Sequence, residues 1–336
     1  MKLPADKVAR LRSFYNGRDV CVTGGAGFIG GHLIDVLLAV GANIAVIDDL
    51  SNSSIEHLSS MMELEPERLR FVHGSILDDE ALAEAVKGAK TIFHLGALGS
   101  VPRSVAEPQR TWSVNATGTV RVLEMARRYQ ADRVILAASS SAYGDQLELP
   151  KVETQTVRPM SPYALTKLAG EQAMATWSRT YGLSTVSLRY FNIFGPRQSA
   201  DNAYAAVVAA FAKALLHGEA PKIYGDGQQS RDMTFVANAV LATLLAGSCP
   251  SKLMGEVINV GTGQRLTMQE LAKKMAHACG MPHLHPTFLP ERAGDVKHSL
   301  ADITVAKQLL GYEPVASLDD GLAETIEWFK RAYTTA

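Results

Sequence analysis

The sequence has little cysteine, no long apolar run and no excess of charge of either sign. Its three cysteines, Cys21, Cys249 and Cys279, are scattered over 336 residues, which fits neither a disulfide framework nor a cysteine-based metal site. No stretch approaches the roughly 20 apolar residues that a transmembrane helix needs, and the N-terminus lacks the apolar segment of a signal peptide. These absences predict a cytoplasmic protein with no membrane partner.

Charges of opposite sign nearly cancel. The chain has 33 Lys and Arg residues against 34 Asp and Glu residues, a net charge of −1. Proteins that bind nucleic acid through its phosphates usually carry an excess of positive charge, so we expect no nucleic-acid partner. His283 and His285 alternate beside prolines without a further ligand at metal-binding spacing, so we expect no metal site.

Apolar residues are plentiful, and their pattern alternates between two periods. They make up 47% of the chain, enough for a sizeable core. Short apolar runs alternate with helical patterns through the first half, which is typical of βαβ units and a parallel sheet. Strands are expected at residues 19–23, 43–48, 69–73, 91–95, 133–137 and 184–190, and helices within 1–18 and at 28–40, 78–87, 104–129 and 162–181.

The pattern changes after about Phe191, where polar loops separate shorter helices expected at 203–217, 267–279 and 318–332. We therefore predict an α/β fold in two parts. Residues 1–191 would form a Rossmann-type doubly wound parallel sheet that binds the cofactor. Residues 192–336 would form mainly a smaller C-terminal α/β substrate lobe, with segments near 232–261 returning to the first part.

A glycine-rich turn, TGGAGFIG, follows the first expected strand and opens a helix. Gly24, Gly27 and Gly30 would permit a tight turn and the close approach of a pyrophosphate, and the helix N-terminus would offer its N–H groups. Asp48 ends the next strand, where a carboxylate binds the ribose 2′-hydroxyl of NAD and repels the 2′-phosphate of NADP. The pattern predicts an NAD site rather than a merely structural turn.

A second candidate site combines a tyrosine and a lysine one helical turn apart. Ser161 suits the N-cap and Pro162 the first helical position, so Tyr163 and Lys167 would share a face. An ammonium near a phenol favours the phenolate and lowers its pKa, which would make Tyr163 a general base. This pattern is common by chance, but its place after the nucleotide-binding units, and after the serine cluster 139–141 at a strand end, favours catalysis over a core tyrosine.

Together, TGGAGFIG, SSSAYG (139–144) and Tyr163-x-x-x-Lys167 resemble the extended short-chain dehydrogenase/reductase family over nearly the whole chain. Within it, the segments RYFN, FGPRQ, YGDG, SRD and RAGD make the sequence most similar to the NAD-dependent UDP-sugar 4-epimerases. The resemblance implies reversible epimerisation through a 4-keto intermediate, with NAD bound tightly. It also implies a homodimer formed by the helices expected at 104–129 and 162–181.

The resemblance further implies roles for individual residues. Tyr163 is the base, Ser139 assists it, and Lys167 is its partner and also binds the nicotinamide ribose. Asn115 supports the active-site helix. The implied cofactor contacts are Gly24, Gly27, Phe28, Ile29, Gly30, Asp48, Asn52, Ser75, Ile76, Tyr163 and Lys167. The implied substrate contacts are Gly99, Ser100, Ser140, Ser141, Asn192, Gln198, Tyr224, Arg231, Arg292, Asp295 and Ser299, of which Asn192, Arg231 and Arg292 bind the diphosphate, Asp295 the uridine ribose and Tyr224 the uracil.

Several residues differ from those of related enzymes, and these differences bear on the expected reaction and on NAD binding. The related 4,6-dehydratases carry an Asp-Glu pair where Ser140 and Ser141 stand, and the decarboxylases a glutamate, so elimination and decarboxylation are disfavoured. Ser75 replaces an aspartate that contacts adenine, and Gly31 replaces a hydroxyl residue near the phosphates, which would weaken NAD retention without removing a catalytic group.

The choice of sugar depends on Ser299, which stands where enzymes restricted to glucose and galactose carry tyrosine. A small residue leaves room for a 2-N-acetyl group, so UDP-N-acetylglucosamine and UDP-N-acetylgalactosamine are the expected substrates. UDP-glucose or UDP-glucuronate is the alternative, because room permits a group without attracting it. A non-catalytic NAD-binding regulator is the remote third interpretation.

Overall fold

The computed structural model describes residues 3–200, 206–291 and 296–334. Its centre is a seven-stranded sheet in the order β11-β6-β5-β4-β1-β2-β3, and every neighbouring pair is parallel. The strands are β1 (Asp19–Thr23), β2 (Asn43–Asp48), β3 (Leu69–His73), β4 (Thr91–His94), β5 (Arg133–Ser139), β6 (Ser184–Tyr190) and β11 (Met254–Val260). The strand order reverses between the neighbouring strands β1 and β4. Such a switch point opens a ligand crevice at the carboxyl ends of the strands.

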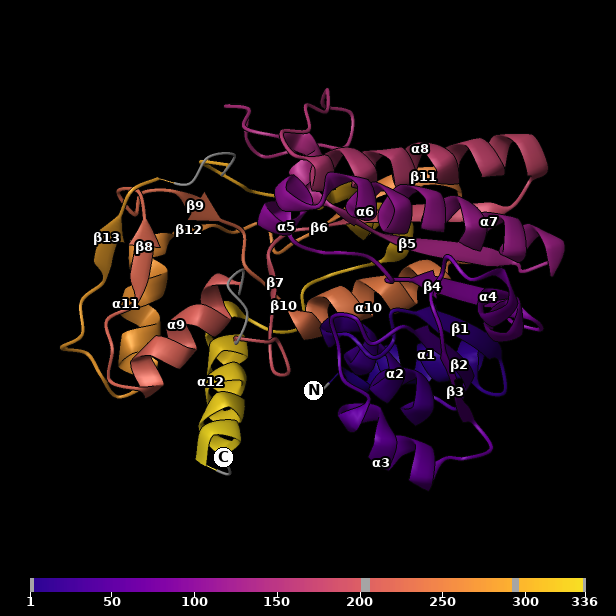
Figure 1. Cartoon of the computed structure of the whole chain (residues 1–336), viewed down its shortest axis with the longest axis horizontal. Coiled ribbons are helices and arrows are strands. Elements are labelled where there is room, and N and C mark those ends of the chain that lie inside the picture. The colour runs from indigo at the N-terminus through magenta and orange to yellow at the C-terminus, as the bar shows by residue number, and fades with distance from the viewer. Residues whose placement is uncertain (1–2, 201–205, 292–295, 335–336) are drawn as a thin grey trace.

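Helices cover both faces of this sheet (Figure 1). In the largest cluster of buried apolar side chains, Val20 and Val22 of β1 pack with residues of α2 (Phe28–Ala39) and α10 (Val236–Gly247). Cys21 points to the other face, into a second cluster with α4 (Asp79–Val86) and α7 (Gly118–Arg128), beside which α8 (Pro162–Tyr181) packs on β5, β6 and β11. Because helices cover both faces, β4 and nearly all of β5 are buried in the middle of the sheet.

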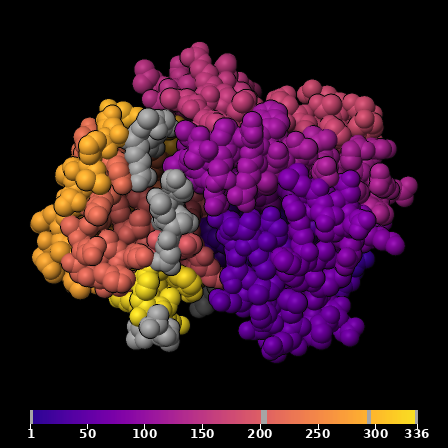
Figure 2. Space-filling model, in the orientation of Figure 1, coloured from indigo at the N-terminus to yellow at the C-terminus, as the bar shows by residue number. Residues whose placement is uncertain are grey.

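The remaining elements form a smaller lobe beside the sheet, and Figures 1 and 2 show it in orange and yellow next to the indigo and magenta part. Its helices are α9 (Val207–Leu216), α11 (Met268–Ala278) and α12 (Leu318–Thr334). Three two-stranded sheets accompany them: β7 (Ile193–Phe194) with β10 (Thr234–Phe235), β8 (Lys222–Tyr224) with β13 (Thr287–Leu289), and β9 (Ser230–Arg231) with β12 (Leu266–Thr267). Helix α1 (Ala5–Tyr15) and helix α3 (Glu56–Leu64) complete the first part of the chain.

The helix expected at 104–129 is wrong as one element. The chain forms α5 (Val101–Ala106), α6 (Pro108–Trp112), a π-helical turn (Ser113–Thr117) and then α7. Pro108 lacks the N–H that would continue α5 and restricts the residue before it, and Glu107 accordingly leaves helical geometry. Helix α10 was not expected either, because all of its residues are buried and a helix that is apolar all round shows no amphipathic period.

Candidate active site

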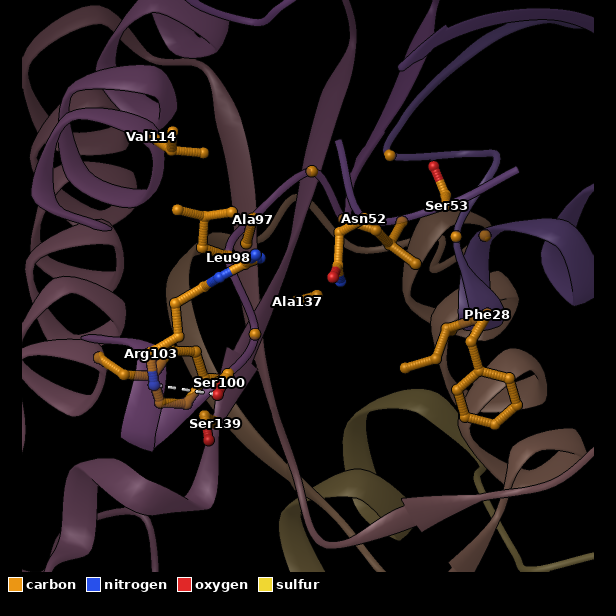
Figure 3. A pocket seen from close by; sticks show the side chains of 18 of the residues that line it. Phe28, Asn52, Ser53, Ala97, Leu98, Ser100, Arg103, Val114, Ala137 and Ser139 are labelled. Carbon is orange, nitrogen blue, oxygen red and sulfur yellow. Dashed lines mark hydrogen bonds between the residues drawn. The ribbon is translucent and has the colours of Figure 1, made fainter. Parts of the chain in front are cut away.

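A large pocket lies at the carboxyl ends of the strands, next to the switch point between β1 and β4. Its volume is about 1880 Å³, and its wall runs from the glycine-rich turn to the second lobe. Figure 3 shows part of it, with Phe28, Asn52 and Ser53 on one side and Ser100, Arg103 and Ser139 on the other. The predicted site residues that line it are Gly24, Gly27, Phe28, Ile29, Gly30, Asp48, Asn52, Ser75, Ile76, Gly99, Ser100, Ser139, Ser140, Ser141, Tyr163, Lys167, Asn192, Gln198, Arg231 and Ser299.

Three predicted residues are not in this group. Tyr224 lies on β8 and is absent from the described residues that line the pocket; its carbonyl accepts a hydrogen bond from Gln229 Nε2 at 2.5 Å. Arg292 and Asp295 lie outside the described residues. The uracil contact expected of Tyr224 therefore has no counterpart in the described pocket wall, and the diphosphate contact of Arg292 and the ribose contact of Asp295 stay predictions.

The glycine-rich turn has the backbone that a dinucleotide needs. Gly24 has a φ of +69°, and a Cβ there would lie 2.6 Å from Gly96 N. A Cβ on Gly30 would overlap the Gly24 carbonyl, so α2 can pack on the turn only with glycine at that position. Gly27 is the N-cap of α2 and no side chain caps the helix. The first N–H groups of α2 thus have no side-chain cap at the pocket wall, an arrangement that suits a phosphate.

Asp48 is held in place at the end of β2. Its Oδ2 accepts from Ala26 N at 3.0 Å, and its Oδ1 accepts from Leu50 N and Ser53 Oγ, each at 2.9 Å. A carboxylate oxygen can accept more than one hydrogen bond, so the fixed group can still bind a ribose diol. The turn, the helix N-terminus and Asp48 together fit NAD.

The two departures near the cofactor have structural explanations. Ser75 lines the pocket and its Oγ accepts from Leu77 N at 3.2 Å, so the hydroxyl is already engaged by the backbone. Gly31 does not leave empty space, because the imidazole of His57 on α3 lies against it and a Cβ there would overlap His57 Nε2. A hydroxyl residue at position 31 would therefore require His57 to move.

The acid–base residues come from two neighbouring elements. Ser139 ends β5, and its Oγ accepts from Ser141 N at 3.2 Å and from Ser141 Oγ at 2.9 Å. Ser161 caps α8 by accepting from Ala164 N, which places Tyr163 in the first turn of the helix at the pocket wall. Lys167 is buried, its Nζ donates to Ala137 O at 2.8 Å, and Nζ lies 5.9 Å from the centre of the Tyr163 ring.

Burial dominates the ionisation of this pair. It raises the pKa of Tyr163, and a hydrogen bond with Ser139 opposes that rise. Burial also lowers the pKa of Lys167 to about 8, although the nearby carboxylate of Glu171 acts in the opposite direction and raises it. The expectation that Lys167 brings the pKa of Tyr163 below that of a free phenol is therefore wrong for the protein alone, since withdrawal from water disfavours both charged forms.

Asn115 connects the loop after β4 to α8. It lies in the π-helical turn, where its Oδ1 accepts from Leu98 N at 2.8 Å. Its Nδ2 donates to Leu98 O and to Thr166 Oγ1, both at 3.1 Å. All of these atoms are withdrawn from water. Asn115 thereby fixes the wall beside Gly99 and the part of α8 that carries Tyr163.

A buried histidine extends this network, and it was not identified from the sequence. His94 Nδ1 lies 2.7 Å from Thr23 Oγ1, and Nε2 lies 3.0 Å from Thr119 Oγ1. Thr119 Oγ1 donates its proton to Asn115 O, so it must accept from His94 Nε2 and Thr23 must donate to Nδ1. Burial lowers the pKa of His94 to about 3, which keeps this bridge between the glycine-rich turn and α7 neutral.

The second lobe completes the pocket. Asn192, with φ of +40°, donates from Nδ2 to Asp232 O at 3.0 Å. Arg231 Nη1 donates to Ser230 O at 3.0 Å and to Lys297 O at 3.1 Å. Ser299 N donates to Ser230 O at 3.0 Å. Backbone contacts thus place Arg231 and Ser299 side by side at the far end of the pocket from the glycine-rich turn.

Within residues 3–200, 206–291 and 296–334, no three His, Cys, Asp or Glu side chains are grouped as metal ligands. In the same part of the chain, none of the helices combines the length and the apolar character that crossing a bilayer requires.

Comparisons with known proteins match this geometry. The model of the NAD dependent epimerase/dehydratase family matches residues 20–261. A UDP-glucose 4-epimerase of Mycolicibacterium smegmatis is 40% identical over 92% of this chain and 97% of its own length. The structure of a UDP-N-acetylglucosamine 4-epimerase from Methanobrevibacter ruminantium, in complex with UDP-N-acetylmuramic acid, has a TM-score of 0.88 at 36% identity and covers 94% of this chain and 99% of that one. A UDP-glucose 4-epimerase from Thermotoga maritima with UDP-glucose has the same TM-score at 37% identity and the same coverage.

Proposed function

Because the chain belongs to the NAD dependent epimerase/dehydratase family, we propose that it interconverts UDP-N-acetylglucosamine and UDP-N-acetylgalactosamine by inverting C4. The chain is an NAD-dependent nucleotide-sugar epimerase, since the relatives most similar to it in the comparisons above, which match over nearly its full length, are named as UDP-sugar 4-epimerases. The acetylated sugar is the finer part of the proposal.

Ser299 is the observation that supports an acetylated sugar. It lines the pocket beside Arg231, is 8% exposed, and is held through its backbone by Ser230. A tyrosine at this position would extend a ring into the space next to the proposed diphosphate contact, whereas a serine leaves that space for a 2-N-acetyl group. Steric room of this kind determines which substrates are rejected.

The side chains at the other end of the pocket suit the chemistry. Tyr163 is positioned to take the proton of the sugar 4-hydroxyl, and its contact with Ser139 stabilises the phenolate that results. Lys167, one turn along α8, keeps its charge below a pH of about 8, and its Nζ lies 5.9 Å from the centre of the Tyr163 ring. When bound, NAD supplies reversible hydride transfer. Ser140 and Ser141 give no acid or base for elimination, so the 4-keto sugar is reduced again and the reaction is redox-neutral.

We further propose how the chain is divided and assembled. Residues 1–191, with α10 and β11, would hold NAD, and the rest of residues 192–336 would hold the UDP-sugar. A homodimer through the face of α6 and α8 is supported by exposed apolar side chains on both helices, Trp112 and Leu165. The reducing cytoplasm is the proposed compartment, and the buried, unpaired thiols of Cys21, Cys249 and Cys279 are consistent with it.

UDP-glucose or UDP-glucuronate is the second candidate, because relatives named as UDP-glucose 4-epimerases are as similar as those named for the acetylated sugar. A panel of UDP-sugars incubated with the purified protein, with the epimers separated by chromatography, decides between them. We expect turnover of the acetylated pair by the wild type and none by Tyr163→Phe. If the wild-type protein did not turn over the acetylated UDP-sugars, the proposal would be refuted.

The Ser299→Tyr variant tests the structural reason. It should lose turnover of UDP-N-acetylglucosamine by at least about tenfold, the effect of a small steric misfit in a pocket, while turnover of any UDP-glucose is kept. Ser299→Ala is the matched control, because it leaves the room unchanged and should keep the acetylated substrate. Equal losses for both sugars in Ser299→Tyr would show that residue 299 does not select the 2-substituent.

A further inference from the structure

We propose that Arg103 of α5 binds the diphosphate of NAD and supplies the positive charge that the glycine-rich turn lacks. The proposal concerns the cofactor half of the pocket and rests on NAD binding, not on which sugar is turned over. It assigns a ligand to a side chain for which the sequence motifs indicate none.

The backbone of Arg103 is fixed in the pocket wall. Ser100 caps α5 by accepting from Arg103 N at 3.2 Å, and Pro102 fixes the first turn. Figure 3 shows the Arg103 side chain extending from Ser100 toward Ala97 and Leu98, with its nitrogen atoms directed into the pocket. Asn52, next to the ribose-binding Asp48, points into the same space from the opposite side. The guanidinium therefore faces the region between β1 and β4 where the cofactor fits.

The other cations that line the pocket are engaged elsewhere. Arg197 is bonded to Asp35 on α2, and Lys167 lies beside Tyr163 and donates to Ala137 O. Arg231 belongs to the second lobe. Arg110 donates to Glu107 Oε2 at 3.0 Å.

Arg103 differs from these cations in how little it contacts. Its Nε lies 3.7 Å from Glu107 Oε1, which is too long for a hydrogen bond, and this is its side chain's one ionic contact with the described residues. The side chain is 29% exposed. A guanidinium has five N–H donors, and Arg103 is among the residues that line the pocket.

The charges that line the cofactor site explain why a guanidinium would bind there. A diphosphate carries two negative charges, whereas a helix N-terminus offers about half a positive charge. Gly31 adds no hydroxyl, and the acidic Asp48, Asp49 and Glu56 also line the pocket. A guanidinium can bind phosphate through two parallel charge-assisted hydrogen bonds. Arg231 and Asn192 lie in the other lobe, which favours the cofactor over the nucleotide sugar as the ligand of Arg103.

The test measures nucleotide binding to the nucleotide-free, full-length chain. NADH is titrated by the change in nicotinamide fluorescence, and ADP-ribose, adenosine and UDP are tested as competitors or by calorimetry. We expect Arg103→Gln to weaken NADH and ADP-ribose by about tenfold to a hundredfold, the range for losing charge-assisted bonds. Adenosine, which has no phosphate, and UDP should bind as before. Arg103→Lys should fall in between, because it keeps the charge but loses the planar fork.

Glu107→Gln is the matched control. It removes the ionic partner of Arg103, which directly follows α5, but leaves the guanidinium in place, so NADH should bind as tightly as to the wild type or more tightly. If Glu107→Gln weakened NADH as much as Arg103→Gln, the ion pair would only stabilise α5 and the proposal would be wrong. It would also be wrong if Arg103→Gln left NADH affinity unchanged or weakened UDP instead. Should Arg103→Gln fail to fold, the ratio of ADP-ribose to adenosine affinity in Arg103→Lys gives the same answer.

Discussion

The ionisation of one tyrosine depends on its contact with one serine. Tyr163 acts as a base only in its deprotonated form, burial raises its pKa, and the hydrogen bond with Ser139 lowers it. Ser139→Ala removes the lowering contribution, so the pKa of Tyr163 should rise. The share of the enzyme that carries the phenolate at a given pH should therefore fall. At neutral pH, kcat should fall by about ten- to a hundredfold, the usual cost of losing a hydrogen bond to a charged group.

A second residue of the site loses its charge at alkaline pH. The pKa of Lys167 is lowered to about 8 by burial, so its charge is present below that pH and is lost above it. Ser139→Ala should leave this loss of charge unchanged. Ser140→Ala is the control, because Ser140 lines the pocket but is not among the groups that shift the pKa of Tyr163. A kcat at neutral pH that is unchanged in Ser139→Ala would show that Ser139 does not act on the base.

At the scale of elements, the π-helical turn and α8 are held together by Asn115. Its side chain makes three buried hydrogen bonds, two to the Leu98 backbone and one to Thr166. Asn115→Ala should leave polar groups without partners and destabilise the fold by about 1–3 kcal/mol. It should also reduce kcat, because α8 carries Tyr163 and Lys167. Thermal unfolding and turnover of the same preparation measure both effects.

Thr117→Ala provides the comparison within the same turn, since Thr117 is exposed. Its melting temperature and kcat should match those of the wild type. A variant at Asn115 that lost stability but kept full kcat would show that the network supports the fold without positioning the catalytic helix.

The elements differ in how well the sequence predicts them. The strands β1, β2, β3 and β6 were predicted to the residue, because a buried parallel strand is a short apolar run between polar turns. Helix α8 was also correct, since Ser161 and Pro162 mark its start and Gly182, with a φ of +72°, its end. Helix α10 and the break at Pro108 were not, because burial on all sides erases the helical period and one proline can either begin a helix or interrupt it.

At the scale of the whole molecule, the sequence predicts which residues carry chemistry better than it predicts where they meet. The glycine-rich turn, Asp48 and Tyr163 sit at recognisable starts and ends of elements, so local rules suffice for them. His94 is different. Its importance comes from contacts with distant segments, namely the link from Thr23 through His94 to Thr119, and sequence spacing contains no signal for such contacts.

The outer face of α6 and α8 gives the last prediction. Trp112, Met160 and Leu165 are 45%, 52% and 47% exposed, and with Pro108 and Pro162 they line a hollow of about 560 Å³. Grouped apolar side chains of this kind mark association surfaces. The same helix α8 presents Tyr163 to the pocket, so a second subunit packed here would also hold the catalytic helix. Leu165→Asp should convert a dimeric wild type to a monomer, because a carboxylate would be buried without a partner.

Light scattering after gel filtration measures the mass of each form, and turnover is assayed on the same fractions. Leu64→Asp is the control, because Leu64 is 80% exposed on α3, on a different part of the surface, and its variant should remain dimeric and fully active. A monomeric wild type would contradict the proposed homodimer. A dimer that persists in Leu165→Asp would place the interface elsewhere. If Leu165→Asp is a monomer with reduced kcat and an unchanged KM, packing against the second subunit positions α8 for catalysis without contributing to substrate binding.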